Sequence, residues 1–224
     1  MPPSLRLVYI EGLAARAFPT RFALRVAGLP FTDERISRDE LQSRRGGDGG
    51  EALIPLGQLP VLYIDGAPLT QSMAQSRWAA SRSAALSPAG SRPDPDGLLA
   101  LAVDETMQVV DELWSKLPHL RHFADRAPAD AAAACAAGRA AWVASVAPKY
   151  LRLLAKRVLA RGGPFVLGEQ VSIADAWLFA FADQVGRGFY DGVPTTLLAE
   201  YPALAANVAR FRSHALFAAH GEPM

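Results

Sequence analysis

Hydrophobic residues follow the periods of strands and helices in turn over the first third of the chain. Residues 5–10 are mostly apolar and end in Val-Tyr-Ile, which predicts a buried strand. Residues 14–27 place bulky apolar side chains at i, i+4 and i+8, which predicts a helix with one apolar face. Residues 31–36 predict a second strand, so this part of the chain alternates strand and helix.

Residues 38–85 continue the alternation. The stretch begins like a helix, but residues 46–50 hold four glycines, which predict a mobile loop. Residues 59–69 contain an Asp-Gly turn between two apolar segments, which predicts a hairpin, and residues 70–85 predict a helix. The order strand, helix, strand, helix, strand, strand, helix therefore predicts an α/β domain over residues 1–85.

The pattern changes after a segment that breaks helices. Residues 86–97 hold three prolines and two glycines, which predicts a linker. Residues 98–224 show no strand pattern and predict an all-helical domain. The expected helices span residues 98–123, 128–160 with a bend or break near Pro148, 172–189, and 201–217 as one or two helices.

Charge and composition exclude several classes of function. The formal net charge is +1 and the basic residues are scattered, which argues against a nucleic-acid or anionic-membrane partner. No stretch approaches the ~18 apolar residues of a membrane span, and residues 1–9 lack the apolar run of a signal peptide. Cys135 is the single cysteine, so no intrachain disulfide is possible and we expect a cytoplasmic protein. His119 and His122 have no carboxylate or cysteine pattern around them, so we expect no metal site.

Leu59 and Pro60 lie where the predicted hairpin begins. A proline removes a donor from a strand ladder, so it belongs at an edge, a strand start or a bulge. If the bond before it is cis, the carbonyl and amide of Leu59 turn outward and can pair with an extended peptide. Taken alone, the dipeptide also fits a trans proline that merely starts a strand.

Gln71 and Ser72 follow the hairpin at a predicted helix start. The amides and the positive dipole end at a helix N-terminus bind anions such as a carboxylate. The glutamine side chain and the serine hydroxyl add a donor and an acceptor for an amino-acid head group. Taken alone, the pair fits an ordinary N-cap, with Thr70 or Ser72 capping the helix.

Together, these motifs resemble the glutathione-site signature of the glutathione transferases. Residues 58–78 contain a proline-led strand, an Asp-Gly hairpin and Gln-Ser at the start of a helix of small residues. The resemblance implies a thioredoxin-like N-terminal domain followed by an all-α C-terminal domain. It also implies that glutathione, an extended tripeptide with a free α-carboxylate, is bound by Gln58, Leu59, Pro60, Gln71 and Ser72.

A second resemblance lies in the helical half of the chain. Residues 168–175 look like the N-capping box of the same family, with Ser172 as the cap and Asp175 three residues later. The two side chains of such a box satisfy each other's backbone donors at a helix start. The role expected for both is therefore folding, and catalysis by Asp175 is disfavoured.

Tyr9 ends the first predicted strand, where the tyrosine-type transferases direct a hydroxyl at the glutathione sulfur. Residues 7–10, followed by Gly12 and Arg16, look most like the sigma-type members. Those members carry Arg-Gly-Arg here, and only Arg16 matches their second arginine, with a shift of one residue. A tyrosine at a strand end also fits a packing residue, but with the signature present we assign Tyr9 to catalysis and Arg16 to glutathione binding.

Two further assignments depart from the sigma pattern. Sigma-type members hold the glycine end of glutathione with a tryptophan and a lysine after the second strand, and this chain has no tryptophan between Phe31 and Leu59. Arg44 or Arg45 would serve instead, and we assign Arg45. Glu112 resembles the acidic residue with which one subunit contacts its partner's glutathione, although a solvated helix face fits it as well.

The resemblance implies a reaction as well as a site. Tyr9 would stabilise the thiolate of glutathione, the co-substrate, which then attacks a small hydrophobic electrophile, a reaction of detoxification. A second, apolar pocket would hold the electrophile, and the protein would be a homodimer without a metal. The residues assigned to the wall of that pocket are Trp114, Leu117, His119 and Phe217.

Other functions on the same fold remain open. One is a glutathione-dependent isomerase or peroxidase, because sigma-type relatives include prostaglandin D synthase. Another is a non-catalytic glutathione-binding or structural relative, as in squid lens crystallins. A thioredoxin-type redox enzyme is disfavoured because no cysteine lies near the end of the first strand, and Cys135 fits a small buried residue of an alanine-rich helix.

Overall fold

The computed structural model describes residues 3–44, 54–87 and 94–221. The chain forms two compact units: Met1–Pro93 with His214–Met224, and Asp94–Ser213. The second unit begins within the segment predicted as a linker. The glycine-rich residues 46–50 lie outside the described residues, so the loop expected there stays a prediction.

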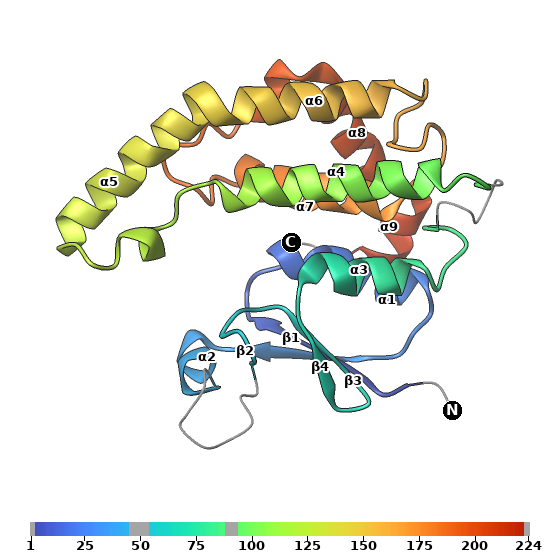
Figure 1. The fold of residues 1–224 in the computed structure, drawn as a ribbon, viewed down its shortest axis with the longest axis horizontal. Helices are drawn as coiled ribbons and strands as arrows, with labels where there is room; N and C mark the ends of the chain where they lie inside the picture. Colours follow the sequence, from blue (N-terminus) through green and yellow to red (C-terminus); the bar gives the residue numbers. More distant parts are fainter. Residues whose placement is uncertain (1–2, 45–53, 88–93, 222–224) are drawn as a thin grey trace. The chain divides into compact units, whose positions relative to one another are not determined.

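The first unit is built on a four-stranded sheet in the order β2-β1-β3-β4 (Figure 1). Strand β1 is parallel to β2 and antiparallel to β3, and β3 forms a hairpin with β4. The elements are β1 (Leu5–Ile10), the short 3-10 helix η1 (Ala15–Ala17), α1 (Phe18–Val26), β2 (Thr32–Ile36), α2 (Arg38–Arg44), β3 (Val61–Ile64), β4 (Ala67–Leu69), α3 (Ser72–Ala80) and α9 (Ala215–His220). This order of strands and helices confirms the one predicted for residues 1–85.

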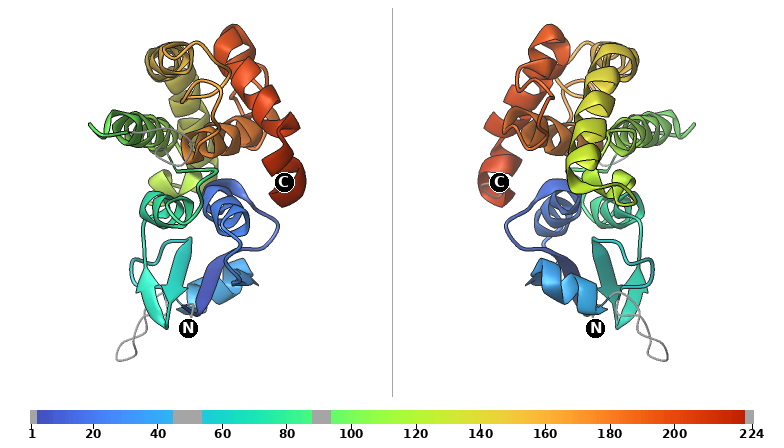
Figure 2. Two further views of the ribbon diagram at one scale, coloured as in Figure 1. Left: turned by 90° about the vertical axis from the view of Figure 1, so that its right-hand side faces the viewer. Right: turned by 90° about the vertical axis from the view of Figure 1, so that its left-hand side faces the viewer.

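The sheet separates two apolar layers because successive side chains point to opposite faces of a strand. On one face, Val8 and its cross-strand partner Val61 belong to a buried cluster against which Leu41 of α2 packs. On the other face lie Leu7 and its partner Leu62, both fully buried. Helices α1 and α3 pack side by side on the sheet (Figures 1 and 2).

Helix α9 extends this layer from the far end of the sequence. Its Phe217 ring lies 6.1 Å from the ring of Phe18 in α1, centroid to centroid. The ring of Phe18 in turn stacks on that of Phe22 at 5.8 Å. The C-terminal segment therefore completes the apolar packing of the first unit.

The second unit is helical apart from two isolated bridges between residues 165 and 170. Its elements are α4 (Leu98–Ser115), η2 (Leu120–Phe123), α5 (Pro128–Ala141), the π-helical segment η3 (Trp142–Val146), α6 (Ala147–Leu159), α7 (Ile173–Gly186), η4 (Leu197–Glu200) and α8 (Pro202–Ser213). Helix α7 is buried from Ile173 to Val185 and contacts both α4 and α8. A helix buried on all sides is the centre of a core, which explains its almost continuous apolar sequence.

Predicted and observed helix ends differ in both units; in the first, α3, predicted over residues 70–85, spans Ser72–Ala80. The helix expected to reach Phe123 ends at Ser115, because Pro118 disfavours helical backbone in the residue before it. The long helix predicted over residues 128–160 is interrupted near Pro148, as expected, but by a π-helical segment rather than a sharp break. Proline lacks the amide hydrogen that would bond the carbonyl four residues earlier, and the wider turn accommodates the loss.

The predicted capping box at the start of α7 is present and entirely buried. One carboxylate oxygen of Asp175 accepts hydrogen bonds from the backbone amide and hydroxyl of Ser172, both at 2.8 Å. The other accepts from the backbone amide of Val166 at 3.0 Å and from the side chain of Asn207 at 2.8 Å. Burial raises the pKa of Asp175, against the opposing effect of these donors. Asp175 thus ties α8 and the preceding loop to the start of α7, a structural role.

Replacing Asp175 by alanine should lower the free energy of unfolding. The change leaves buried donors of Val166 and Asn207 without acceptors, at about 1–3 kcal/mol each. Chemical denaturation would measure the loss. Asp130→Ala is the matched control, because Asp130 also lies in the first turn of a helix, α5, but is exposed. Unchanged stability together with lost turnover would show that Asp175 has a chemical role instead.

Candidate functional site

Three predicted site residues meet at one end of the sheet because of the strand register. In the hairpin, Leu62 pairs with Leu69, so the register places Pro60 across from Gln71, just beyond the strands. Between β1 and β3, Val8 pairs with Val61, so Tyr9 lies across from Pro60. Tyr9, Pro60 and Gln71 therefore lie at the same end of the sheet, just past the last residues paired between β1 and β3 and between β3 and β4.

The backbone at this end has an unusual conformation in two places. The peptide bond between Leu59 and Pro60 is cis, which meets the condition set for pairing with an extended peptide. Gln71 precedes the first residue of α3 and has a φ of 68°, in the left-handed region that residues with a side chain seldom occupy. Residues with a side chain in the left-handed region, such as Gln71, concentrate at ligand-binding sites.

Ser72 is the first residue of α3, two residues after the position where the sequence predicted this helix to begin. The first amides of a helix have no partners within it, and this end carries partial positive charge. The Gln71–Ser72 corner therefore presents features that suit a carboxylate. Gln58 is exposed beside Leu59, and Arg16 is half-buried in η1.

Tyr9 is 8% exposed, and its ring has a charged neighbour that the sequence analysis did not identify. The guanidinium carbon of Arg21 lies 5.7 Å from the centre of the Tyr9 ring, within cation–π range. Arg21 comes from α1, and its side chain is completely buried. The sequence holds one indication that Arg21 is buried: it lies three residues after Phe18, on the apolar face of the predicted helix.

The buried charge of Arg21 is balanced by Asp33 of β2. The Arg21 side chain donates a hydrogen bond to one carboxylate oxygen of Asp33 at 2.8 Å. Arg35 donates two hydrogen bonds to the other oxygen, at 2.8 and 3.0 Å. Although burial alone would raise it, these hydrogen bonds hold the pKa of Asp33 below its ordinary value. Asp33 therefore stays ionised beside Arg21 at neutral pH.

Of the two arginines considered for the glycine end of glutathione, Arg44 is among the described residues and Arg45 is not. Arg44 is bound to two carboxylates, Glu34 of β2 and Glu40 of α2, within the first unit. Glu34 also binds Arg6 of β1, so Arg44 is one member of an ion-pair network. Arg45 lies outside the described residues, and its assignment stays a prediction.

Glu112 lies on α4 of the second unit in a small polar cluster. Its carboxylate accepts a hydrogen bond from the hydroxyl of Tyr150 at 2.6 Å and pairs with the amine of Lys116 at 3.2 Å. The Tyr150 hydroxyl and then Lys116 lower the pKa of Glu112. The carboxylate is half exposed and ionised, so both of its predicted interpretations, a ligand contact and a solvated helix face, remain predictions.

The four residues assigned to the apolar pocket fall in both units. Trp114 and Leu117 are buried in the second unit, and the indole of Trp114 donates a hydrogen bond to the Tyr190 hydroxyl at 2.6 Å. The His119 ring meets the Tyr190 ring edge-on at 5.7 Å. Phe217 belongs to the first unit, where it contacts Phe18. The pocket itself stays a prediction, and Tyr190 is an aromatic neighbour that the sequence analysis missed.

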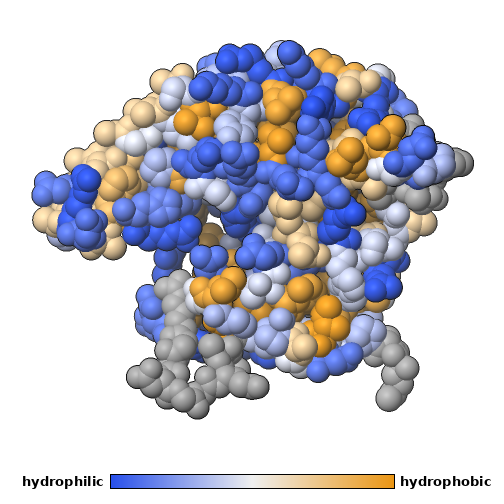
Figure 3. All heavy atoms as spheres, in the orientation of Figure 1, coloured by the Kyte–Doolittle hydropathy of each residue, from blue (hydrophilic) through white to orange (hydrophobic). Residues whose placement is uncertain are grey.

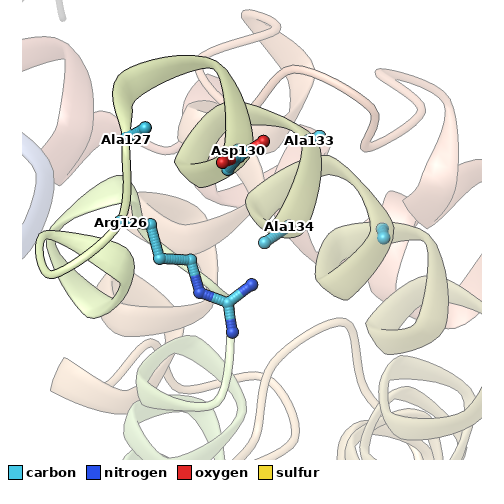
Figure 4. Close-up of a pocket in the computed structure, with 6 residues that line it drawn as sticks. Arg126, Ala127, Asp130, Ala133 and Ala134 are labelled. Atoms are coloured by element: carbon cyan, nitrogen blue, oxygen red, sulfur yellow. The ribbon is translucent and has the colours of Figure 1, made fainter.

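A separate hollow of about 600 Å³ lies along α5 (Figure 4). Alanines from α5 line it together with Arg126 and Asp130, and no predicted site residue contributes to it. Figure 4 shows Arg126 and Ala127 in the segment before α5, and Asp130, Ala133 and Ala134 on α5 itself. Tyr9, the residue proposed to activate the thiol, does not line this hollow.

Among the described residues, no three His, Cys, Asp or Glu side chains cluster as metal ligands would. No helix in those same residues has the length and apolar character needed to cross a membrane. Polar and apolar side chains are interspersed over the face of the helical unit seen in Figure 3.

Comparison with known proteins finds similarity to one family over part of the chain. Residues 120–222 match the family described as "Glutathione S-transferase, C-terminal domain". A glutathione S-transferase of Anopheles gambiae is 39% identical over 75 residues, which cover 34% of this chain and 34% of that protein. The alignment thus spans about a third of the mosquito relative.

Two solved structures share the fold of the whole chain. Prostaglandin synthase D of Nilaparvata lugens superposes with a TM-score of 0.76 at 17% identity, covering 99% of this chain and all of that one. A sigma-class glutathione transferase of Fasciola hepatica has a TM-score of 0.68 at 20% identity, covering 92% of this chain and 89% of that one. The predicted fold class, a thioredoxin-like domain followed by a helical domain, is confirmed. The family match and the aligned segment of the mosquito relative are both to glutathione S-transferases, and the solved structures show a shared fold.

Proposed function

We propose that this chain is a tyrosine-type, sigma-like glutathione transferase that joins the glutathione sulfur to small hydrophobic electrophiles. The observation that supports the proposal is the strand register, which directs the segments of Tyr9, Pro60 and Gln71 to one end of the sheet. The residue proposed to activate the sulfur and the two segments proposed to hold the peptide share that end. All three were assigned to one site from the sequence, and they come from three different segments of the fold.

Glutathione binding follows from the chemistry of the two segments. The backbone of Leu59 would pair with the extended tripeptide, as a neighbouring strand does. The γ-glutamyl carboxylate would lie at the start of α3, against the free helix amides, Gln71 and Ser72. These contacts are equally strong before and during the reaction, so they set affinity rather than rate.

Tyr9 would supply the chemical step. A thiol with a pKa of ~8.5 is only a few per cent ionised at pH 7. Lowering that pKa by ~2 units requires ~2.7 kcal/mol of preferential stabilisation of the thiolate. One hydrogen bond from a phenol to a charged acceptor contributes ~1.5–3 kcal/mol, so the Tyr9 hydroxyl suffices without a general base.

A glutathione-dependent isomerase is the second candidate. The observation that favours it is the similarity of fold to prostaglandin synthase D of Nilaparvata lugens over the full chain. An isomerase would use the same glutathione thiolate, stabilised by Tyr9, and would differ in the pocket for the second substrate. Both reactions therefore share the predictions below for the glutathione site.

The proposal includes a cytoplasmic homodimer. Helix α4 exposes two leucines one turn apart, Leu98 at 58% and Leu101 at 62%. Exposed apolar side chains at this spacing form a stripe that a second subunit can cover. Glu112 on the same helix would then contact the glutathione of the partner subunit.

Replacing Tyr9 by phenylalanine should slow conjugation at neutral pH by roughly 10- to 100-fold. The ring and its packing stay, and only the hydroxyl that stabilises the thiolate is removed. The rate should recover as the pH rises towards the pKa of the free thiol, because solvent then ionises it. Steady-state kinetics across pH, with the thiolate absorbance of the glutathione complex, would measure both effects.

Tyr63→Phe is the matched control for Tyr9. Tyr63 is a strand tyrosine of similar burial, but it lies on the opposite face of the sheet because its partner is Arg6. Removing the Tyr63 hydroxyl should leave the rate of conjugation and its dependence on pH unchanged. Equal effects of the two changes, or none from either, would reduce Tyr9 to a packing residue.

The double change Gln71→Ala, Ser72→Ala should raise KM for glutathione more than it lowers kcat. It removes contacts made equally in the ground state and the transition state. Calorimetric titration with glutathione would measure the affinity directly. Ser81→Ala at the other end of α3 is the control, since its hydroxyl bonds only the helix carbonyl of Trp78 among the described contacts. Unaltered affinity in the double variant would place the γ-glutamyl group elsewhere.

The protein should sediment as a species of about twice 23.9 kDa at micromolar concentration. Replacing Leu101 by glutamate should shift it to monomer, because a charge would be buried in the interface. Leu159→Glu is the control, since that leucine is as exposed but lies on α6. A monomer with full activity would contradict both the dimer and the proposed role of Glu112.

A further inference from the structure

Gln75 of α3 is a buried polar residue that connects the two segments of the candidate site. Its side chain is completely inaccessible to solvent. The amide nitrogen donates hydrogen bonds to the carbonyl of Pro60 at 3.0 Å and to the carbonyl of Leu69 at 2.7 Å. One planar group therefore uses both of its hydrogens to hold two strand ends.

The two carbonyls belong to the two halves of the site. Pro60 follows Leu59, whose backbone is proposed to pair with the peptide. Leu69 ends β4, two residues before Gln71. Since proline has no amide hydrogen, Pro60 cannot donate to the hairpin ladder at this point. The Gln75 side chain supplies a donor to both strands where the backbone of Pro60 supplies none.

The side-chain carbonyl oxygen of Gln75 helps to identify the role of the amide group. Its carbonyl oxygen is buried and accepts no hydrogen bond within the part of the chain that the structure describes. Burying an acceptor without a partner is unfavourable, and an apolar side chain of similar size would avoid it. Such a side chain would leave the carbonyls of Pro60 and Leu69 without this donor. The two donated hydrogen bonds are thus the feature that only an amide provides here.

We propose that Gln75 is a positioning residue of the glutathione site, a role that rests on the proposed function. It touches no ligand, and it fixes the spacing between the Leu59–Pro60 segment and the Gln71–Ser72 corner. Glutathione spans both segments, so a change in their spacing weakens the fit at one end or the other. Small displacements of positioned groups have large effects on binding and rate.

The test compares Gln75→Met with Gln184→Met. Methionine keeps the length of the side chain and removes both donors. Gln184 is a matched control because it is also a buried helix glutamine whose carbonyl oxygen has no partner among the described residues, but it lies in α7 of the second unit. Gln75→Asn is a milder variant, in case methionine prevents folding: the amide remains but is one methylene too short to keep both hydrogen bonds.

Two readouts separate positioning from a general loss of stability. Hydrogen–deuterium exchange of the ligand-free protein over residues 58–72 should rise in both Gln75 variants and stay unchanged in Gln184→Met. The dissociation constant for glutathione should rise about tenfold in Gln75→Met, with kcat nearly constant, and should not change in the control.

Unchanged exchange over residues 58–72 would overturn the proposal, and so would faster exchange with unaltered glutathione affinity. Equal loss of affinity in Gln75→Met and Gln184→Met would also overturn it, because the effect would then be one of overall stability. If the unaltered protein bound no glutathione, the proposed function would fail instead. The exchange comparison would still decide whether Gln75 holds the two segments together.

Discussion

The register between β1, β3 and β4 is the constraint on which the candidate site depends. A slip of one residue would turn every side chain of a strand to the opposite face and would separate Tyr9 from Pro60. The apolar partners fix the register, since Val8 and Val61 must enter one layer and Leu7 and Leu62 the other. The same burial that stabilises the sheet therefore sets the position of the proposed chemistry.

Buried polar groups reinforce this arrangement at specific points. Arg21 joins α1 to Asp33 of β2 behind the Tyr9 ring, and Asp175 joins α7 to the loop before it. Removing one partner of a buried ion pair such as Arg21–Asp33 typically costs about 3–5 kcal/mol, because the other charge stays buried and unpaired. Removing Asp175 instead leaves buried neutral donors without an acceptor. Each of these groups is therefore a structural requirement of its own unit, separate from the groups proposed to contact glutathione.

Much of this organisation was predictable from the sequence, because it rests on local signals. The hairpin of residues 59–69 has an Asp-Gly turn, and the box at Ser172 and Asp175 has a fixed spacing, so both were identified and are present. Arg21, Gln75 and Tyr190 were not assigned roles, because their partners lie 12, 15 and 76 residues away. The position of Arg21 three residues after Phe18 indicates the apolar face of the helix, but it does not indicate that Asp33 lies against it. The end of α4 was misjudged because its apolar pattern continues past the point where Pro118 disfavours helical backbone.

The proposed function depends on one arrangement, in which glutathione binds across the end of β1, the hairpin and α3 with its sulfur at Tyr9. A crystal structure of the glutathione complex tests this most directly. We expect the sulfur within hydrogen-bond distance of the Tyr9 hydroxyl, with the tripeptide backbone paired to Leu59 and the γ-glutamyl carboxylate at Ser72. Glutathione bound elsewhere, or bound here with its sulfur turned away from Tyr9, would contradict it.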